Sequence, residues 1–160
     1  MTDDQVNNSF EVVASDAKEF VTVMVDGQCL GIPVLSVHDV LNAQSITRIP
    51  KAPPSVVGVL NLRGRIVTAV DLRIHLGFKE REEGAETMSV VVEHNGDPFS
   101  LLIDSVGEVL ALPNSQYEKT PVTLDERLRS VSSGIYRLEE GIMVVLDVAR
   151  LLEFKVEDAA

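Results

Sequence analysis

The chain has 160 residues, a formal net charge of −11 and 45% hydrophobic residues, with one cysteine and no tryptophan. This length fits one ordinary domain or two small ones, and Cys29 has no second cysteine with which to form an internal disulfide. The acidity argues against a nucleic-acid partner, because such affinity depends on neutralising phosphates with Lys and Arg. Since no hydrophobic leader or membrane-spanning apolar run appears, we expect a cytoplasmic protein.

The charge is unevenly distributed along the chain. Residues 48–79 carry six basic residues and a single acidic one, Asp71, which gives this stretch a charge of +5. A positive region on an acidic protein suits docking to an acidic protein surface. A solvated face without a partner is equally compatible with the charge pattern alone.

Two stretches of the chain resemble each other. Residues 20–78 recur in residues 89–154, at an offset of 69 as far as Leu110 and of 76 from Gly134 onward, so the second copy carries seven extra residues. Two copies indicate two like modules rather than a solenoid. We expect halves at roughly 19–86 and 87–155, and leave open whether strands are exchanged between them.

The first part of each copy predicts a strand hairpin. After a polar segment, residues 1–18, which we expect to be a disordered tail, residues 20–25 and 29–34 read as strands around a type I′ turn at Asp26 and Gly27. Asn95 and Gly96 repeat this turn. Residues 36–42 predict a short helical turn running into a strand, whereas their copy, residues 105–112, fits helix or strand equally. Cys29, on an apolar strand, is expected to be a buried, inert thiol.

The second part of each copy predicts another hairpin and a helix. Pro50, Pro53 and Pro54 interrupt regular structure, and residues 57–62 and 65–70 then form strands that turn at Arg63 and Gly64. Asp71 and Asp147 each precede a helical apolar pattern, where a carboxylate can cap the helix. Four or five short strands per copy suit a small closed barrel, and we expect two barrels side by side.

Catalytic and metal-binding patterns are weak in this sequence. Asp71 and His75 have the spacing of two ligands on one helix face, but the counterpart of His75 is Leu151, so we expect His75 to pack at the helix edge. Ser36, His38 and Asp39 are too close in sequence to form a catalytic relay. The glycines do not fit a phosphate-binding loop either. We therefore predict no enzyme, no metal and no cofactor.

Residues 58–73 read GVLNLRGRIVTAVDLR, which resembles the signature of the CheW family of chemotaxis coupling proteins. The resemblance continues through residues 31–40, 46–50 and 103–106, and covers residues 18–155. It implies a mainly β chain in which residues 19–155 form one CheW-like domain. This domain would contain two SH3-like, five-stranded barrel subdomains that share a core, with short helices that include a C-terminal one.

The resemblance also implies a function and a set of site residues. The function is that of a non-enzymatic adaptor, which bridges chemoreceptor tips to the regulatory domain of the histidine kinase CheA. Such an adaptor joins membrane arrays through its partners without inserting into the membrane, and self-association in rings is a further expectation. Family members place a receptor groove between the subdomains, and the residues that match its lining here are Val37, Val106 and Val109, with Arg63 near its rim. The other residues that the resemblance implies for receptor or kinase binding are Asp39, Gly58, Asn61 and Arg65. Asp39 stands where the family usually has glutamate.

The residues themselves leave alternatives open. The three valines of the groove fit core positions equally well, because periodic apolar residues usually face inward. Arg63 differs, since its counterpart in the second copy is Glu139 and the fold therefore does not require a cation at this hairpin tip. Asn61 and Arg65 likewise become Arg137 and Gly141. We expect a partner to bind where the copies differ; the alternatives are a barrel that binds a small ligand or nucleic acid, or a CheW-like adaptor of a pathway other than motility.

Overall fold

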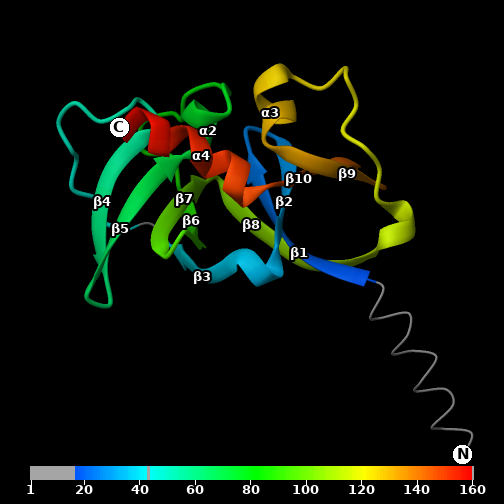
Figure 1. Ribbon diagram of the computed structural model, residues 1–160, viewed down its shortest axis with the longest axis horizontal. Helices are drawn as coiled ribbons and strands as arrows, with labels where there is room; N and C mark the ends of the chain where they lie inside the picture. The colour runs from blue at the N-terminus through cyan, green and yellow to red at the C-terminus, as the bar shows by residue number, and fades with distance from the viewer. Residues whose placement is uncertain (1–16, 43, 160) are drawn as a thin grey trace, which may run out of the picture.

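The computed structural model of the protein describes residues 17–42 and 44–159 (Figure 1). In this part of the chain the strands are β1 (Ala17–Val25), β2 (Gln28–Pro33), β3 (Val37–Asn42), β4 (Val56–Leu62), β5 (Arg65–Asp71), β6 (Met88–His94), β7 (Asp97–Ile103), β8 (Ser105–Pro113), β9 (Ser132–Leu138) and β10 (Gly141–Leu146). The helices are the 3-10 turns η1 (Val34–Ser36) and η2 (Asn114–Gln116), and α2 (Leu72–His75), α3 (Glu126–Ser130) and α4 (Val148–Ala159). No helix of the described residues is long and apolar enough to cross a membrane.

The strands form two five-stranded sheets with the same arrangement. The first has the order β8-β1-β2-β10-β9 and the second has the order β3-β6-β7-β5-β4. Replacing each strand of one sheet by its repeat counterpart gives the other sheet, including the parallel pairs β10 with β2 and β5 with β7. The predicted fold class, mainly β with two pseudo-repeated modules and short helices, is confirmed. In Figure 1 the second sheet lies at one end of the molecule and β9 at the other.

The sheets do not follow the two halves of the sequence. Each sheet combines a hairpin from one copy with three strands from the other. The first sheet contains β1 and β2 of the first copy with β8, β9 and β10 of the second. The second sheet contains β6 and β7 of the second copy with β3, β4 and β5 of the first. A division at 19–86 and 87–155 therefore cuts through both sheets, because the hairpins β1-β2 and β6-β7 are exchanged. We call the module of the first sheet barrel A and that of the second sheet barrel B.

Each barrel closes through one isolated bridge next to a glycine. Thr47, which follows edge strand β3, pairs with Val59 of the opposite edge strand β4, with N–H···O distances of 2.8 Å in both directions. Glu118 pairs with Ile135 in the same way in barrel A. A Cβ on Gly58 would lie 2.1 Å from the carbonyl oxygen of Thr47, and one on the matching Gly134 would enter the Tyr117 ring. The two glycines let the closing segments approach, so that one bridge connects the two edges of each sheet.

The predicted turns and caps are present. Asp26 and Gly27 have φ angles of 50° and 79°, and Arg63 and Gly64 have φ angles of 53° and 84°, as a type I′ turn requires. The Asp71 carboxylate accepts a hydrogen bond from the Arg73 amide at 2.9 Å and caps α2. Asp147 accepts one from the Arg150 amide at the start of α4. Both aspartates thus have the capping role that the sequence predicts.

Three apolar clusters hold the structure together. The largest lies between the sheets and combines Val23 and Leu30 of barrel A with Val92 and Leu101 of barrel B, so the barrels share a core. Two smaller clusters occupy matching places in the barrels, around Tyr136 and Met143 in one and around Leu60 and Val67 in the other. Cys29 was predicted to be buried; it is half-buried beside the barrel A cluster.

The expected N-terminal tail needs one correction. Residues 1–16 lie outside the described part of the chain, so the prediction for them is not addressed. Ala17 and Lys18, however, belong to β1 and pair with Pro113 and Leu112 of β8. The long edge strand β8 offers backbone partners to these two residues, and backbone pairing does not depend on their polar or small side chains.

Candidate functional site

Most of the predicted site residues lie on one face of barrel B. Strand β3 carries Val37 and Asp39 on its inner side, where both are half-buried, and the turn between β4 and β5 carries Arg63. Strand β3 bulges between Val37 and Asp39, so that these residues oppose Val92 and Val91 of β6. Such a bulge inserts an extra residue and redirects side chains. It brings Asp39 within reach of the β4-β5 hairpin.

Asp39 and Arg63 form an ion pair. The Nη2 atom of Arg63 lies 3.1 Å from Oδ2 of Asp39, with 78% of the arginine side chain and 25% of the aspartate side chain exposed. Oδ1 of Asp39 accepts a hydrogen bond from the Val40 amide. Oδ2 is buried and accepts no hydrogen bond from the described residues, so the guanidinium charge is what compensates it there. Most of the Arg63 side chain remains available to a carboxylate on another protein.

Two other predicted site residues support this pair structurally. Oδ1 of Asn61 accepts a hydrogen bond from the Gly64 amide at 3.0 Å, which fixes the turn on which Arg63 stands. Gly58 is buried under Thr47 at the barrel closure. Asn61 therefore contributes to the geometry of the hairpin tip, where it is exposed, and Gly58 contributes to the closure of the barrel.

Arg65 is linked through Glu93 to His38, and neither of these two was predicted as a binding residue. Its guanidinium lies 3.9 Å from Oε2 of Glu93 and donates a hydrogen bond to the Gly96 carbonyl at 3.2 Å. Glu93 also lies 3.8 Å from the His38 ring. Glu93 stands beside the Asn95-Gly96 turn, where a charged residue is ordinary, so no local pattern could identify it. His38 is also one of the residues at which this chain departs from the family pattern, where it could tune the choice of receptor or kinase.

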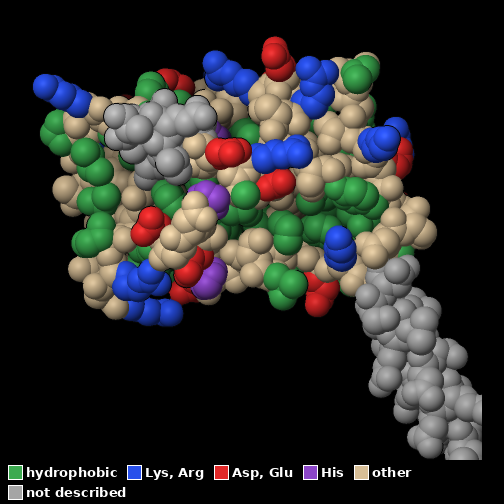
Figure 2. All heavy atoms as spheres, viewed as in Figure 1, with side chains coloured by type: hydrophobic (Ala, Val, Ile, Leu, Met, Phe, Trp, Pro, Cys, Tyr) green, Lys and Arg blue, Asp and Glu red, His purple; other side chains and the backbone are tan. Residues whose placement is uncertain are grey.

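These side chains surround a cavity of about 190 Å³. Its wall is apolar at the bottom and charged at the rim, and it is formed by His38, Asp39, Leu62, Arg63, Arg65, Val67, Val91, Val92, Glu93 and Pro98. Figure 2 shows basic side chains gathered at the lower left, over the tip of the β4-β5 hairpin, with histidine and acidic side chains next to them. An apolar cavity with a charged rim suits a protein side chain better than a reaction.

The two valines of β8 lie outside this cavity. Val106 is half-buried and packs on the shared core, whereas Val109 is 56% exposed. They pair with Val23 and Val21 of β1, and β8 has a bulge at the place that matches the bulge of β3. Val37 and Val106 thus contribute to the core, while Val109 is exposed on an edge strand; their role in receptor binding stays a prediction.

The residues considered for metal binding have other partners. Asp71 caps α2 and its Oδ2 lies 2.8 Å from Nη1 of Arg81. The Nε2 atom of His75 lies 2.8 Å from the carbonyl oxygen of Leu151, its repeat counterpart. Among the side chains that the structure describes, no group of three or more His, Cys, Asp or Glu is placed to hold a metal ion.

A double barrel with a shared core and a rim of ion pairs defines a protein-binding module. The CheW-like domain family matches residues 19–155, so the chain belongs to the CheW-like family. It is 30% identical over 146 residues to the chemotaxis protein CheW of Thermotoga maritima, covering 89% of this chain and 94% of that protein. It is 26% identical to CheW of Helicobacter pylori, covering 84% and 81%.

The fold is also found in a solved structure. The scaffolding protein TtCheW from Thermoanaerobacter tengcongensis superposes with a TM-score of 0.77 at 27% identity, covering 86% of this chain and 93% of that one. The resemblance to the CheW family, which residues 58–73 indicate, is thereby confirmed over nearly the whole chain.

Proposed function

We propose that this chain is a non-enzymatic adaptor of chemotaxis-type signalling, which couples chemoreceptors to the histidine kinase CheA. Its relatives are chemotaxis proteins and a scaffolding protein by name. As an adaptor it would act in the cytoplasm and reach receptor arrays through its partners. An adaptor transfers no group itself, and its contribution is to hold two proteins at a fixed distance and orientation.

The observation that carries this proposal is the Asp39–Arg63 pair, which exists in one barrel only. The positions that match Asp39 and Arg63 in barrel A are Glu108 and Glu139, two acidic residues that cannot pair. Both barrels fold, so the pair is not a requirement of the fold. A charged group that the fold does not need, exposed at a hairpin tip, is typical of a recognition site.

The proposal assigns partners to surfaces. Exposed apolar side chains such as Val109 on the edge strand β8 offer a partner protein a place to pack. We assign Val37, Val106 and Val109, with the Asp39–Arg63 pair at the rim, to the receptor. The surplus of basic residues in 48–79, which includes Arg63 and Arg65, favours an acidic surface on one partner and raises the rate of encounter with it. The regulatory domain of CheA, and other copies of the chain in rings, would occupy the remaining surface.

Binding measurements with a matched control test this function. Arg63→Glu should abolish binding to a soluble fragment of a chemoreceptor tip, measured by calorimetry, while the variant remains folded by circular dichroism. Arg137→Glu is the control, because Arg137 is also an exposed arginine that pairs with a carboxylate, Glu118 at 3.0 Å, but in barrel A. Equal binding by the parent and by folded Arg63→Glu would overturn the assignment. Salt-sensitive retention on DNA in place of receptor binding would favour the alternative function.

A further inference from the structure

The chain passes between the two sheets at two places within the described residues. The first crossing is η1, which joins β2 of barrel A to β3 of barrel B, and the second is the single residue Asp104, which joins β7 to β8. Leu35 of η1 and Asp104 are repeat counterparts, at the offset of 69. Both crossings lead directly into an edge strand, β3 or β8, that carries predicted partner-binding residues.

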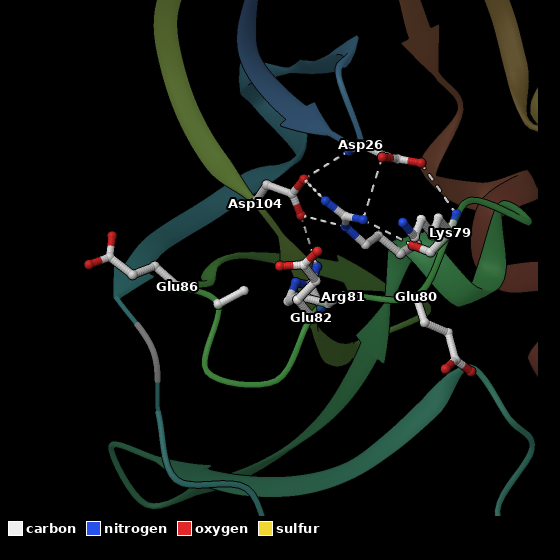
Figure 3. Close-up of a pocket in the computed structure, with 9 residues that line it drawn as sticks. Asp26, Lys79, Glu80, Arg81, Glu82, Glu86 and Asp104 are labelled. Atoms are coloured by element: carbon white, nitrogen blue, oxygen red, sulfur yellow. Dashed lines mark hydrogen bonds and ion pairs between the residues drawn. The ribbon is translucent and has the colours of Figure 1, made fainter.

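Asp104 is bonded to both barrels. Its amide donates to the Met24 carbonyl of β1 at 3.0 Å, and its Oδ2 accepts from the Asp26 amide at 2.8 Å. Arg73, at the start of α2 in barrel B, donates to both carboxylate oxygens, at 2.9 Å through Nε and 2.5 Å through Nη2. Figure 3 shows Asp104 between the Asp26 turn and the arginines that converge on it.

A loop closes over this contact. Arg81, in the segment between α2 and β6, donates to Asp104 at 3.2 Å and to Asp71 at 2.8 Å. Arg73 also donates to the Lys79 carbonyl at 3.0 Å and lies 3.5 Å from the Asp26 carboxylate. The side chains of Arg73 and Arg81 are only 16% and 12% exposed, so these ion pairs are weakly screened by water. We call Asp26, Asp71, Arg73, Arg81 and Asp104 the crossover cluster.

The other crossing has no such bonds. Leu35 is 98% exposed, and η1 has no side-chain hydrogen bond at its cap. The repeat counterparts of Asp26, Arg73 and Asp104 are Asn95, Ala149 and Leu35, so these three charges of the cluster have no counterpart there, while Asp71 is matched by Asp147. The fold therefore forms one crossing without an ionic cluster, which indicates that the cluster has a purpose other than making the crossing.

We propose that the crossover cluster positions β8 against β3 and thereby sets the spacing of the partner-binding edge strands. Asp104 is two residues from Val106 and five from Val109, and it anchors the start of β8 to the hairpin β1-β2 and to α2 together. A bidentate arginine fixes both the distance and the direction of the carboxylate that it holds. Asp104, Arg73 and Arg81 are thus positioning residues; the geometric part of this inference stands alone, and its consequence for binding rests on the proposed function.

A distance measurement across the two edge strands tests the geometric part. Spin labels at Val40→Cys on β3 and Glu108→Cys on β8, in a Cys29→Ser background, should give one narrow distance distribution. Asp104→Asn and Arg73→Gln should broaden or displace it, while Arg137→Gln, which removes an ion pair outside the crossover cluster, should not. If either cluster variant folds poorly, Arg73→Lys keeps the positive charge and removes the planar guanidinium that forms the two-pronged bond to Asp104 and the bond to Lys79. A distribution that is the same in all folded variants would overturn the proposal.

Binding to a soluble receptor-tip fragment tests the consequence. The cluster variants, measured where circular dichroism shows them fully folded, should bind about fivefold to tenfold more weakly than the parent, a usual size for coupling between separate sites. A purely structural role would lower the melting temperature and leave the affinity of the folded protein unchanged, which would contradict the proposal. If the parent itself does not bind the fragment, the proposed function fails, and the label distances still decide the role of the cluster.

Discussion

The guanidinium of Arg63 lies 3.1 Å from a buried carboxylate oxygen of Asp39 that accepts no hydrogen bond from the described residues. The two residues come from different hairpins and are 24 positions apart, with the β3 bulge and the Asn61-supported turn holding them together. The aspartate limits where the arginine can point, and the arginine stays mostly exposed. A partner thus meets an arginine whose orientation is already restricted, which lowers the entropic cost of binding.

Reversing the charge of Arg63 should separate binding from stability. Arg63→Glu removes the charge that compensates the buried oxygen of Asp39 and places two carboxylates side by side, so the free energy of unfolding should fall by about 1–3 kcal/mol, which leaves the variant folded. Receptor-fragment binding should be lost. Thermal melts and calorimetry on the same samples check both statements. A loss of stability large enough to unfold the variant would show that Arg63 is structural.

Substituting Gly58 should lower the stability of the protein and leave receptor binding by the folded protein unchanged. Gly58→Ala drives a methyl group against the Thr47 carbonyl at the closing bridge, so we expect a loss of about 1–3 kcal/mol of stability, as for other overpacked sites. Gly134→Ala should have a similar effect in barrel A, where Tyr117 is in the way. Urea titration of both variants measures this. Binding by the folded fraction of Gly58→Ala should stay normal, and a binding defect without a stability defect would contradict the structural role.

The crossover cluster predicts a specific acid sensitivity. Burial alone would raise the pKa of Asp104, but the hydrogen bonds from Arg73, the Asp26 amide and Arg81, together with the Arg73 charge, lower it to about 2. Because the folded pKa lies below the unfolded value, the stabilisation is fully present above about pH 4 and is lost as the pH falls toward 2. The shift corresponds to about 2 kcal/mol.

The variant Asp104→Asn isolates this contribution. Its unfolding free energy should depend less steeply on pH between about 4 and 2 than that of the parent, since the group that takes up the proton is gone. Urea titrations of both proteins across this range measure the difference. Parallel curves for the two proteins would mean that Asp104 titrates normally in the folded state.

The thiol of Cys29 should react slowly. Burial raises its pKa, and the charge of Glu140 adds to the effect, so little reactive thiolate is present near neutral pH. Alkylation of the native protein at pH 8 should be at least about tenfold slower than that of the protein unfolded in urea. Equal rates in the two states would show that β2 exposes this side chain more than the structure indicates.

Much of the fold could be predicted because its signals are local. The Asp-Gly and Asn-Gly turns, the proline break and the capping aspartates depend on neighbouring residues only, and the repeat showed which of them recur. The exchange of hairpins between barrels depends on pairing between distant strands, for which a single sequence carries no signal. The bulges explain why residues 36–42 looked partly helical, since an extra residue breaks the two-residue period of a strand.

The site was predicted less completely than the fold. Arg63 and Asp39 were found through the family resemblance and the broken repeat, but their mutual contact depends on the β3 bulge. Asn61 and Gly58 were selected as binding residues, and the structure adds their supporting roles at the turn and at the closure. Glu93 and Arg81 went unnoticed because charged residues beside turns and in acidic loops are common, and only three-dimensional proximity distinguishes them.

Co-sedimentation measures the adaptor function most directly. Vesicles that carry a chemoreceptor are mixed with the kinase CheA, with and without this chain, and the kinase in the pellet is quantified. We predict that the kinase pellets with the vesicles only when the chain is present, and that Arg63→Glu abolishes this while Arg137→Glu does not. Kinase recruitment that is independent of the chain would contradict the account.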